Sequence, residues 1–206
     1  MEFIAPAREA TAEIEVKKSR FIGTVAPAFS AEEAEARIAA VRRRYSDATH
    51  NVFAYLVGSG TPLERLSDDG EPRGTAGYPV LEVIKKRGLR NVVCVVTRYF
   101  GGTLLGAGGL LRAYGRAASA ALDAAGTARY VYHKVLSAVL DYDQLGKVQR
   151  DLEARGVQVF GVSYAEKVTL RAYVPSEEVD SAVGWLKNLT AGKGLFIVEE
   201  GKFIPR

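Results

Sequence analysis

Apolar residues recur along the first part of the chain at spacings that predict alternating strands and helices. Residues 11–16 alternate as a half-buried strand, and residues 21–25 can return beside them across a basic turn. Ser30 and Glu33 form a capping box, which predicts a helix that ends near residue 45. The further expected elements are strands at 51–57 and 91–97 and helices at about 75–87 and 106–125.

Beyond residues 126–133 the pattern changes to strand, helix, strand, strand, helix, strand. This βαββαβ order is that of a ferredoxin-like domain, and Asp143 and Ser176 are the expected caps of its two helices. The sequence therefore predicts two α+β domains, at residues 1–128 and 133–206, rather than one doubly wound sheet. The expected strands lie at 135–140, 157–164, 168–174 and 195–199, and the helices at 144–155 and 177–189.

The bulk composition is that of a globular protein. Of the 206 residues, 48% are hydrophobic and 25% are charged, and no apolar run approaches the length of a membrane span. The first residues lack the apolar core of a signal peptide, so we expect a cytoplasmic protein with no membrane contact. The net charge of +4 permits contact with nucleic acid without requiring it.

The single cysteine, Cys94, excludes an internal disulfide and a multi-cysteine zinc site. It lies within an apolar run, residues 92–96, that is typical of a buried strand. Burial in apolar surroundings raises the pKa of a thiol. We therefore expect Cys94 to be a small, unreactive core residue.

The segment from residue 66 to residue 121 combines an acidic turn, many glycines and several arginines. Five glycines lie between Gly101 and Gly109. Glycine permits backbone conformations and close approaches that other residues forbid. The backbone here is therefore expected either to receive a ligand or to pack unusually tightly.

Several motifs of this segment resemble those of the IMPACT family, whose bacterial members are called YigZ-like. The resemblance covers roughly residues 8–125 and includes two shorter motifs nearer the N-terminus. The motifs are Lys-Ser-Arg-Phe-Ile at 18–22, Ala-Thr-His-Asn at 48–51, Asp-Asp-Gly-Glu-Pro at 68–72, Gly-Thr-Ala-Gly at 74–77, Val-Thr-Arg-Tyr-Phe-Gly-Gly at 96–102, Leu-Gly-Ala-Gly-Gly-Leu at 105–110 and Arg-Ala-Tyr-Gly at 112–115.

This resemblance implies an N-terminal domain like the second domain of ribosomal protein S5, followed by a ferredoxin-like domain. Residues 186–194 are also similar to a segment in the last domain of elongation factor G. The implied function is that of a translation-linked regulatory protein that contacts the ribosome or structured RNA, with a protein partner in translation control as a further possibility.

Phosphate or RNA backbone is the ligand expected for the glycine-rich segment. If residues 106–109 open a helix, their free amides and the helix dipole favour an anion, and arginine matches phosphate geometry. The glycines can instead let the helix pack closely, and the arginines can pair with the acidic turn. We favour internal pairing for Arg112 and a binding role for Arg98 and Arg116. The candidates are Arg98, Gly101, Gly102, Gly106, Gly108, Gly109, Arg112 and Arg116.

The acidic turn offers a different chemistry through Asp68, Asp69 and Glu71. Oxygen ligands in a loop suit magnesium, although the same residues are common in ordinary turns. His50 is a weak candidate for a general base and can equally be a structural histidine. The alternative function is therefore a magnesium-dependent enzyme that acts on a phosphorylated small molecule or nucleotide. The sequence assigns no metal site and no cofactor.

Aromatic and basic residues complete the candidates. Tyr99, Phe100 and Tyr114 can stack on bases or fill gaps in the core. Each basic cluster alone is expected to be a solvent-exposed surface. If the fold brings two clusters together with Arg98, phosphate backbones become the natural partner, and binding should weaken with salt. The clusters lie at residues 17–20, 42–44 and 85–90. A third possible function is docking of a protein partner on the glycine-rich segment.

Overall fold

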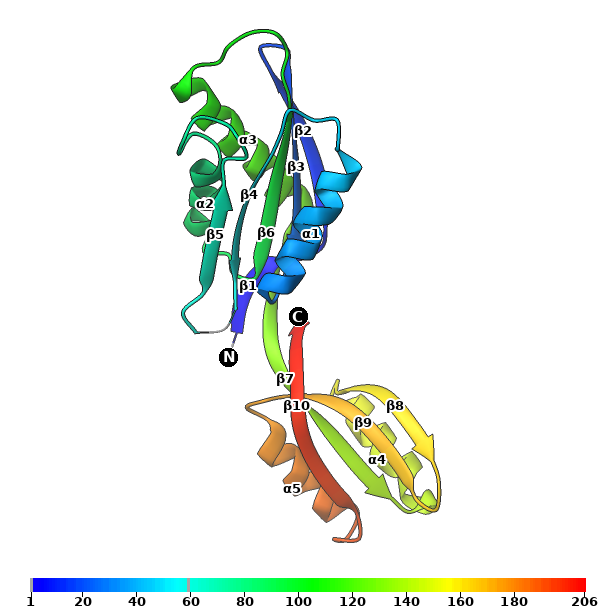
Figure 1. Ribbon diagram of the computed structural model, residues 1–206. Coiled ribbons are helices and arrows are strands. Elements are labelled where there is room, and N and C mark those ends of the chain that lie inside the picture. Colours follow the sequence, from blue (N-terminus) through cyan, green and yellow to red (C-terminus); the bar gives the residue numbers. More distant parts are fainter. Residues whose placement is uncertain (1, 59) are drawn as a thin grey trace. The chain divides into compact units, whose positions relative to one another are not determined.

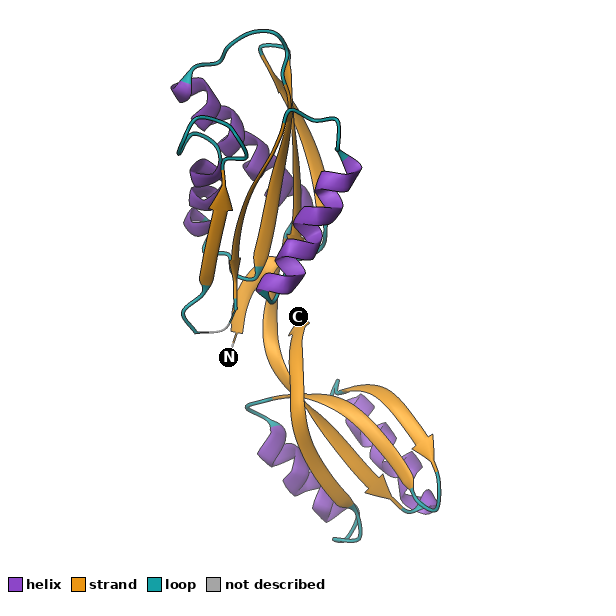
Figure 2. Ribbon diagram, in the orientation of Figure 1, coloured by secondary structure: helices purple, strands orange, loops and turns teal. Residues whose placement is uncertain are grey.

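The computed structural model describes residues 2–58 and 60–206 (Figure 1). The chain divides into two compact units between Arg129 and Tyr130, and the second unit also includes Glu2. Each unit has its own sheet and helices (Figure 2). The α+β class expected from the sequence is confirmed. Among the described residues, no helix is long and apolar enough to cross a bilayer.

The first unit contains an antiparallel sheet in the order β2-β3-β6-β4-β5. Strand β6 is the central strand, and nearly all residues of β6 and of its neighbour β4 are buried because helices cover both faces of the sheet. Helices α2 and α3 pack on one face, and α1 packs on the other. The elements are β2 Ala10–Val16, β3 Ser19–Pro27, α1 Ala31–Arg44, β4 His50–Val57, β5 Leu63–Ser67, α2 Gly77–Lys86, β6 Val92–Tyr99 and α3 Ala107–Ala125.

Helix α1 begins where the capping box predicts. The hydroxyl of Ser30 accepts a hydrogen bond from the Glu33 amide at 3.2 Å, and the Glu33 carboxylate accepts one from the Phe29 amide at 2.8 Å. These bonds satisfy amides that have no partner within the helix. The apolar stripe of α1 then packs on Phe53 and Tyr55 of β4.

Two strands of the structure were not predicted. Strand β1, Glu2–Pro6, pairs with β7 in the second sheet, and β5 forms an edge of the first. The sequence of β5 is Leu-Glu-Arg-Leu-Ser, and its residues are exposed or only partly buried. An edge strand with charged side chains lacks the apolar pattern of a core strand, so periodicity alone does not reveal it.

The second unit has the predicted βαββαβ order. Strand β7 pairs with β9 and with β10, and β8 lies beyond β9. Helices α4 and α5 share one apolar core with the sheet, which confirms the ferredoxin-like arrangement. The elements are β7 Thr127–Leu140, α4 Tyr142–Ala154, β8 Gln158–Tyr164, β9 Val168–Pro175, α5 Val179–Leu189 and β10 Leu195–Pro205.

The predicted caps of α4 and α5 were wrong. Asp141 caps α4 and forms a capping box with Gln144, so Asp143 falls inside the first turn. Helix α5 starts after Glu178, two residues beyond Ser176. The cap of α4 is the residue directly after β7, whereas Glu178 at the start of α5 makes no side-chain hydrogen bond to the helix.

Cys94 lies fully buried in β6, and burial raises the pKa of its thiol to about 12. Because the thiolate is the reactive form, we predict that a thiol reagent at neutral pH leaves the native protein unmodified. The same reagent should modify one thiol per chain once denaturant unfolds the first unit. Mass spectrometry measures the modification. Rapid modification of the folded protein would contradict the burial of this strand.

Candidate functional site

One end of the first sheet gathers most of the candidate residues, and strand register explains why. Phe21 of β3 and His50 of β4 both pair with Arg98 of β6. The β2–β3 turn, the start of β4 and the glycine-rich loop after β6 therefore leave the sheet at the same end (Figure 1). Arg42, near the end of α1, contacts Asp69 of the acidic loop at 2.9 Å and so reaches this end as well.

Glu71 is the centre of this end of the sheet. Its carboxylate accepts hydrogen bonds from Arg98 Nη1 at 2.6 Å and from the Tyr114 hydroxyl at 2.8 Å. The side chains of Glu71 and Arg98 are 4% and 6% exposed. Burial is the main cause that raises the pKa of the Tyr114 hydroxyl, and the hydrogen bond to Glu71 raises it further. The acidic loop is thus tied to β6 and α3 by a buried ion pair and a buried hydroxyl.

Arg98 makes further contacts within the protein. Its guanidinium reaches the Ser19 hydroxyl at 3.4 Å and lies over the rings of Phe21 and Phe100, at 5.4 and 5.5 Å from their centroids. Its Nε is buried without a hydrogen-bond partner within the described parts of the chain. Arg98 is therefore paired with the acidic turn, through Glu71. Its guanidinium is not presented to solvent.

Asp68 and Asp69 are also engaged by the protein itself. Asp68 accepts hydrogen bonds from the amides of Gly74, Ala76 and Gly77 at 2.7–3.1 Å, so it caps α2 from across the loop. Asp69 accepts one from the Asn51 amide at 2.6 Å in addition to its ion pair with α1. Over residues 2–58 and 60–206, no group of three or more acidic, histidine or cysteine side chains is placed to hold a metal ion.

His50 lies beside this network with its ring fixed in one orientation. Its Nδ1 is 2.7 Å from the carbonyl oxygen of Asp69, so Nδ1 carries the hydrogen and donates it. Nε2 lies 3.9 Å from the Glu71 carboxylate. The acidic loop therefore holds His50 through Nδ1 and places Nε2 beside Glu71.

The glycines of the candidate segment have two different surroundings. A Cβ on Gly101 would overlap the backbone of Lys18, while its amide donates to the Ser19 hydroxyl at 3.1 Å. A Cβ on Gly102, Gly106 or Gly108 would meet nothing within 4 Å. Gly101 therefore allows the loop to pack on the β2–β3 turn, whereas Gly102, Gly106 and Gly108 leave an open backbone. Gly109 differs from these three, because a Cβ there would lie 3.1 Å from the Cβ of Leu105.

Helix α3 begins in this open backbone. Its cap, Gly106, has φ 67° and provides no side-chain hydrogen bond to the first turn. Arg112 and Arg116 follow on the exposed side of α3. Among the described contacts neither arginine forms an ion pair, so the internal pairing favoured for Arg112 is not found.

Two of the three basic clusters lie at this end of the sheet, although Arg42 and Arg44 of the second are held by ion pairs to Asp69 and Glu9. Lys17 and Lys18 form the exposed β2–β3 turn, with φ 47° and 66°, and residues 42–44 end α1. The third cluster lies at the other end, where Lys85 pairs with Glu64 at 2.6 Å. Phe100 and Leu104 are 47% and 83% exposed. We call Lys17, Lys18, Phe100 and residues 102–108 the glycine-loop surface.

Sequence reasoning missed part of the network. Ser19 receives both Arg98 and the Gly101 amide, and Thr97 donates to the Asn51 side chain at 2.7 Å. Tyr114 is fully buried and does not lie at the surface as a stacking platform. Their place in the sequence could have indicated these residues, because all of them lie inside or next to the motifs that carry the family resemblance.

The fold and the site define a two-domain α+β protein whose candidate residues all lie in the first unit. Residues 17–122 match the family described as the Impact N-terminal domain, and residues 139–193 match a domain of unknown function, DUF1949. Every candidate residue falls within the first match. The chain belongs to the IMPACT family, a translation-related regulatory family.

Relatives span most of the chain. IMPACT family member YvyE of Bacillus subtilis is 40% identical over 181 residues, which cover 88% of this chain and 83% of the relative. IMPACT family member YigZ of Escherichia coli is 34% identical over 96% of this chain and 98% of its own. Mouse Protein IMPACT is 34% identical over 95 residues, only 29% of its length. A crystal structure of a hypothetical protein, 32% identical, superposes with a TM-score of 0.67 over 98% of both chains.

The buried ion pair predicts a specific stability effect. Glu71→Gln leaves Arg98 as an uncompensated buried cation, and we expect it to destabilise the first unit by about 3–5 kcal/mol. Glu64→Gln removes the carboxylate of an exposed pair and should cost less than about 1 kcal/mol. Urea unfolding of both variants measures the difference. Equal, small losses would show that the Glu71–Arg98 pair is solvated.

The two glycine environments predict opposite outcomes for one substitution. Gly101→Ala forces the loop away from Lys18 and should cost about 1–3 kcal/mol, the usual range for overpacking. Gly108→Ala places a methyl group in open space on a helix and should stabilise by about 0.5–1 kcal/mol. Thermal unfolding of the two variants tests this contrast; a neutral Gly101→Ala would contradict the close approach.

Proposed function

We propose that this protein takes part in translation control by contacting structured RNA, including RNA of the ribosome, through the glycine-loop surface. The observation that carries the proposal is an exposed lysine turn, Lys17 and Lys18, beside a loop whose backbone is open. Phosphate contacts supply most of the affinity of such interfaces. Lysines on a tight turn and unpaired amides at a helix start are groups that bind phosphates.

Phe100 adds a second kind of contact. Phe100 is 47% exposed and its ring lies against the guanidinium of Arg98, while its amide donates to the Thr49 hydroxyl at 3.1 Å. Stacking of a base on such a ring is favourable for every base type. In this proposal Arg98 positions the ring from below, because it is held by Glu71, and does not itself touch the nucleic acid.

The enzyme alternative has less support. Its magnesium site requires carboxylates free to bind a cation, and Asp68, Asp69 and Glu71 are all occupied by donors of the protein. The feature that favours it is the position of His50, whose Nε2 lies 3.9 Å from the Glu71 carboxylate. Nucleotide and magnesium titrations with a thermal-shift readout would detect such a ligand.

The RNA proposal predicts where charge matters. Lys17→Asn/Lys18→Asn removes two cations from the glycine-loop surface while keeping residues that tolerate positive φ. We expect weaker ribosome binding and a salt dependence shallower by roughly 1–2 in log–log slope. Co-sedimentation with ribosomes over a salt series, with and without nuclease, measures this. Phe100→Ala should weaken binding by about 1–3 kcal/mol if one base stacks there.

The matched control is Lys85→Gln/Lys86→Gln, which changes net charge equally at the opposite end of the sheet. It should leave both affinity and salt slope close to those of the unaltered protein. Equal losses for the two lysine pairs would indicate unspecific attraction and contradict the assignment of the surface. Sedimentation only as free protein at all salt concentrations would contradict the function itself.

A further inference from the structure

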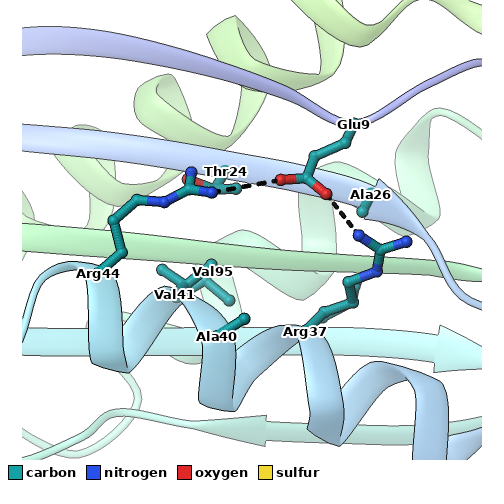
Figure 3. A pocket seen from close by; sticks show the side chains of 9 residues that line it. Glu9, Thr24, Ala26, Arg37, Ala40, Val41, Arg44 and Val95 are labelled. Atoms are coloured by element: carbon teal, nitrogen blue, oxygen red, sulfur yellow. Dashed lines mark hydrogen bonds and ion pairs between the residues drawn. The ribbon is translucent and has the colours of Figure 1, made fainter.

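A cavity of about 130 Å³ lies on the other face of the first sheet, beneath α1 (Figure 3). Helix α1 packs over β4 and β6 through Ile38 and Val41. Small residues, Thr24 and Ala26 on β3 and Ala40 on α1, leave the space beside it unfilled. The cavity is therefore a consequence of where α1 sits and of the short side chains opposite it.

The walls of the cavity are apolar and its mouth is charged. Val41, Val93 and Val95 line the interior. Arg37 and Arg44, two turns apart on α1, point towards the opening from either side, with the carboxylate of Glu9 between them (Figure 3). That carboxylate lies 2.6 Å from Arg37 and 4.0 Å from Arg44.

The position of Glu9 indicates that the mouth of the cavity binds a carboxylate. Two guanidinium groups share a single carboxylate, so the opening keeps an excess positive charge. The side chains of Glu9, Arg37 and Arg44 are 39%, 51% and 54% exposed. Exposed ion pairs contribute little to stability, so exchanging the Glu9 carboxylate for another carboxylate costs little.

We propose that this cavity binds a small organic carboxylate with a short, branched aliphatic body. The ligand carboxylate takes the place of Glu9 between Arg37 and Arg44, and its aliphatic part lies against the three valines. The volume is well below the roughly 300–1,000 Å³ of pockets for drug-sized ligands, which restricts the occupant to a few carbon atoms. The site is independent of the RNA contact, which uses the loops at the end of the sheet.

Isovalerate and its neutral isostere isovaleramide form a direct test on the full, ¹⁵N-labelled chain. In ¹H–¹⁵N correlation spectra, isovalerate should shift the amide signals of Thr24, Ala26 and Ala40 in a saturable manner. Isovaleramide has the same shape without the charge and should bind roughly tenfold more weakly, because charge-assisted hydrogen bonds are the strong ones. Equal binding of acid and amide, or shifts that do not saturate, would overturn the proposal.

Variants at the mouth should change affinity in opposite directions. Glu9→Gln removes the competing carboxylate and should tighten isovalerate binding several-fold, whereas Arg37→Ala and Arg44→Ala should each weaken it. Glu35→Gln and Arg65→Ala alter a comparable exposed pair on α1 and β5, 2.8 Å apart, and should leave binding unchanged. Weaker binding by Glu9→Gln, or the same affinity in all the variants, would show that the arginines do not hold the ligand.

Discussion

The buried ion pair between Glu71 and Arg98 is the contact on which the candidate site depends. It joins the acidic loop to the last residues of β6, and Tyr114 brings α3 to the same carboxylate. Ser19 adds the β2–β3 turn through Arg98. Four segments that are far apart in sequence therefore meet at one charged centre, and the position of each depends on the others.

Such a pair is a costly way to obtain stability. Removing two charges from water carries a desolvation penalty that their attraction repays only with good geometry and further hydrogen bonds. Here Glu71 receives two donors, but Arg98 Nε has no hydrogen-bond partner among the described residues. The benefit of the pair is positional: it fixes the ring of Phe100 and the base of the glycine-rich loop, where an apolar contact would allow sliding.

Local patterns were sufficient to predict much of the fold. The Ser30–Glu33 box is a local cap and the βαββαβ order follows from periodicity, whereas the edge strands β1 and β5 lack such a pattern. The site was harder to predict, because Arg98 meets a partner 27 residues away and its burial depends on strand register. Sequence motifs marked the right region but could not distinguish an exposed arginine, Arg112, from an internal one.

The glycines illustrate the same limit in more detail. Gly101 and Gly108 belong to one continuous motif, yet the first is required by a close approach to Lys18 and the second faces open space. A side chain at Gly101 would separate the loop from the β2–β3 turn and so disturb Ser19 and Arg98. The open backbone from Gly102 to Gly108 is then presented from a fixed base. Tight packing and an open backbone are in this structure consecutive parts of the same loop, and the first holds the second in place.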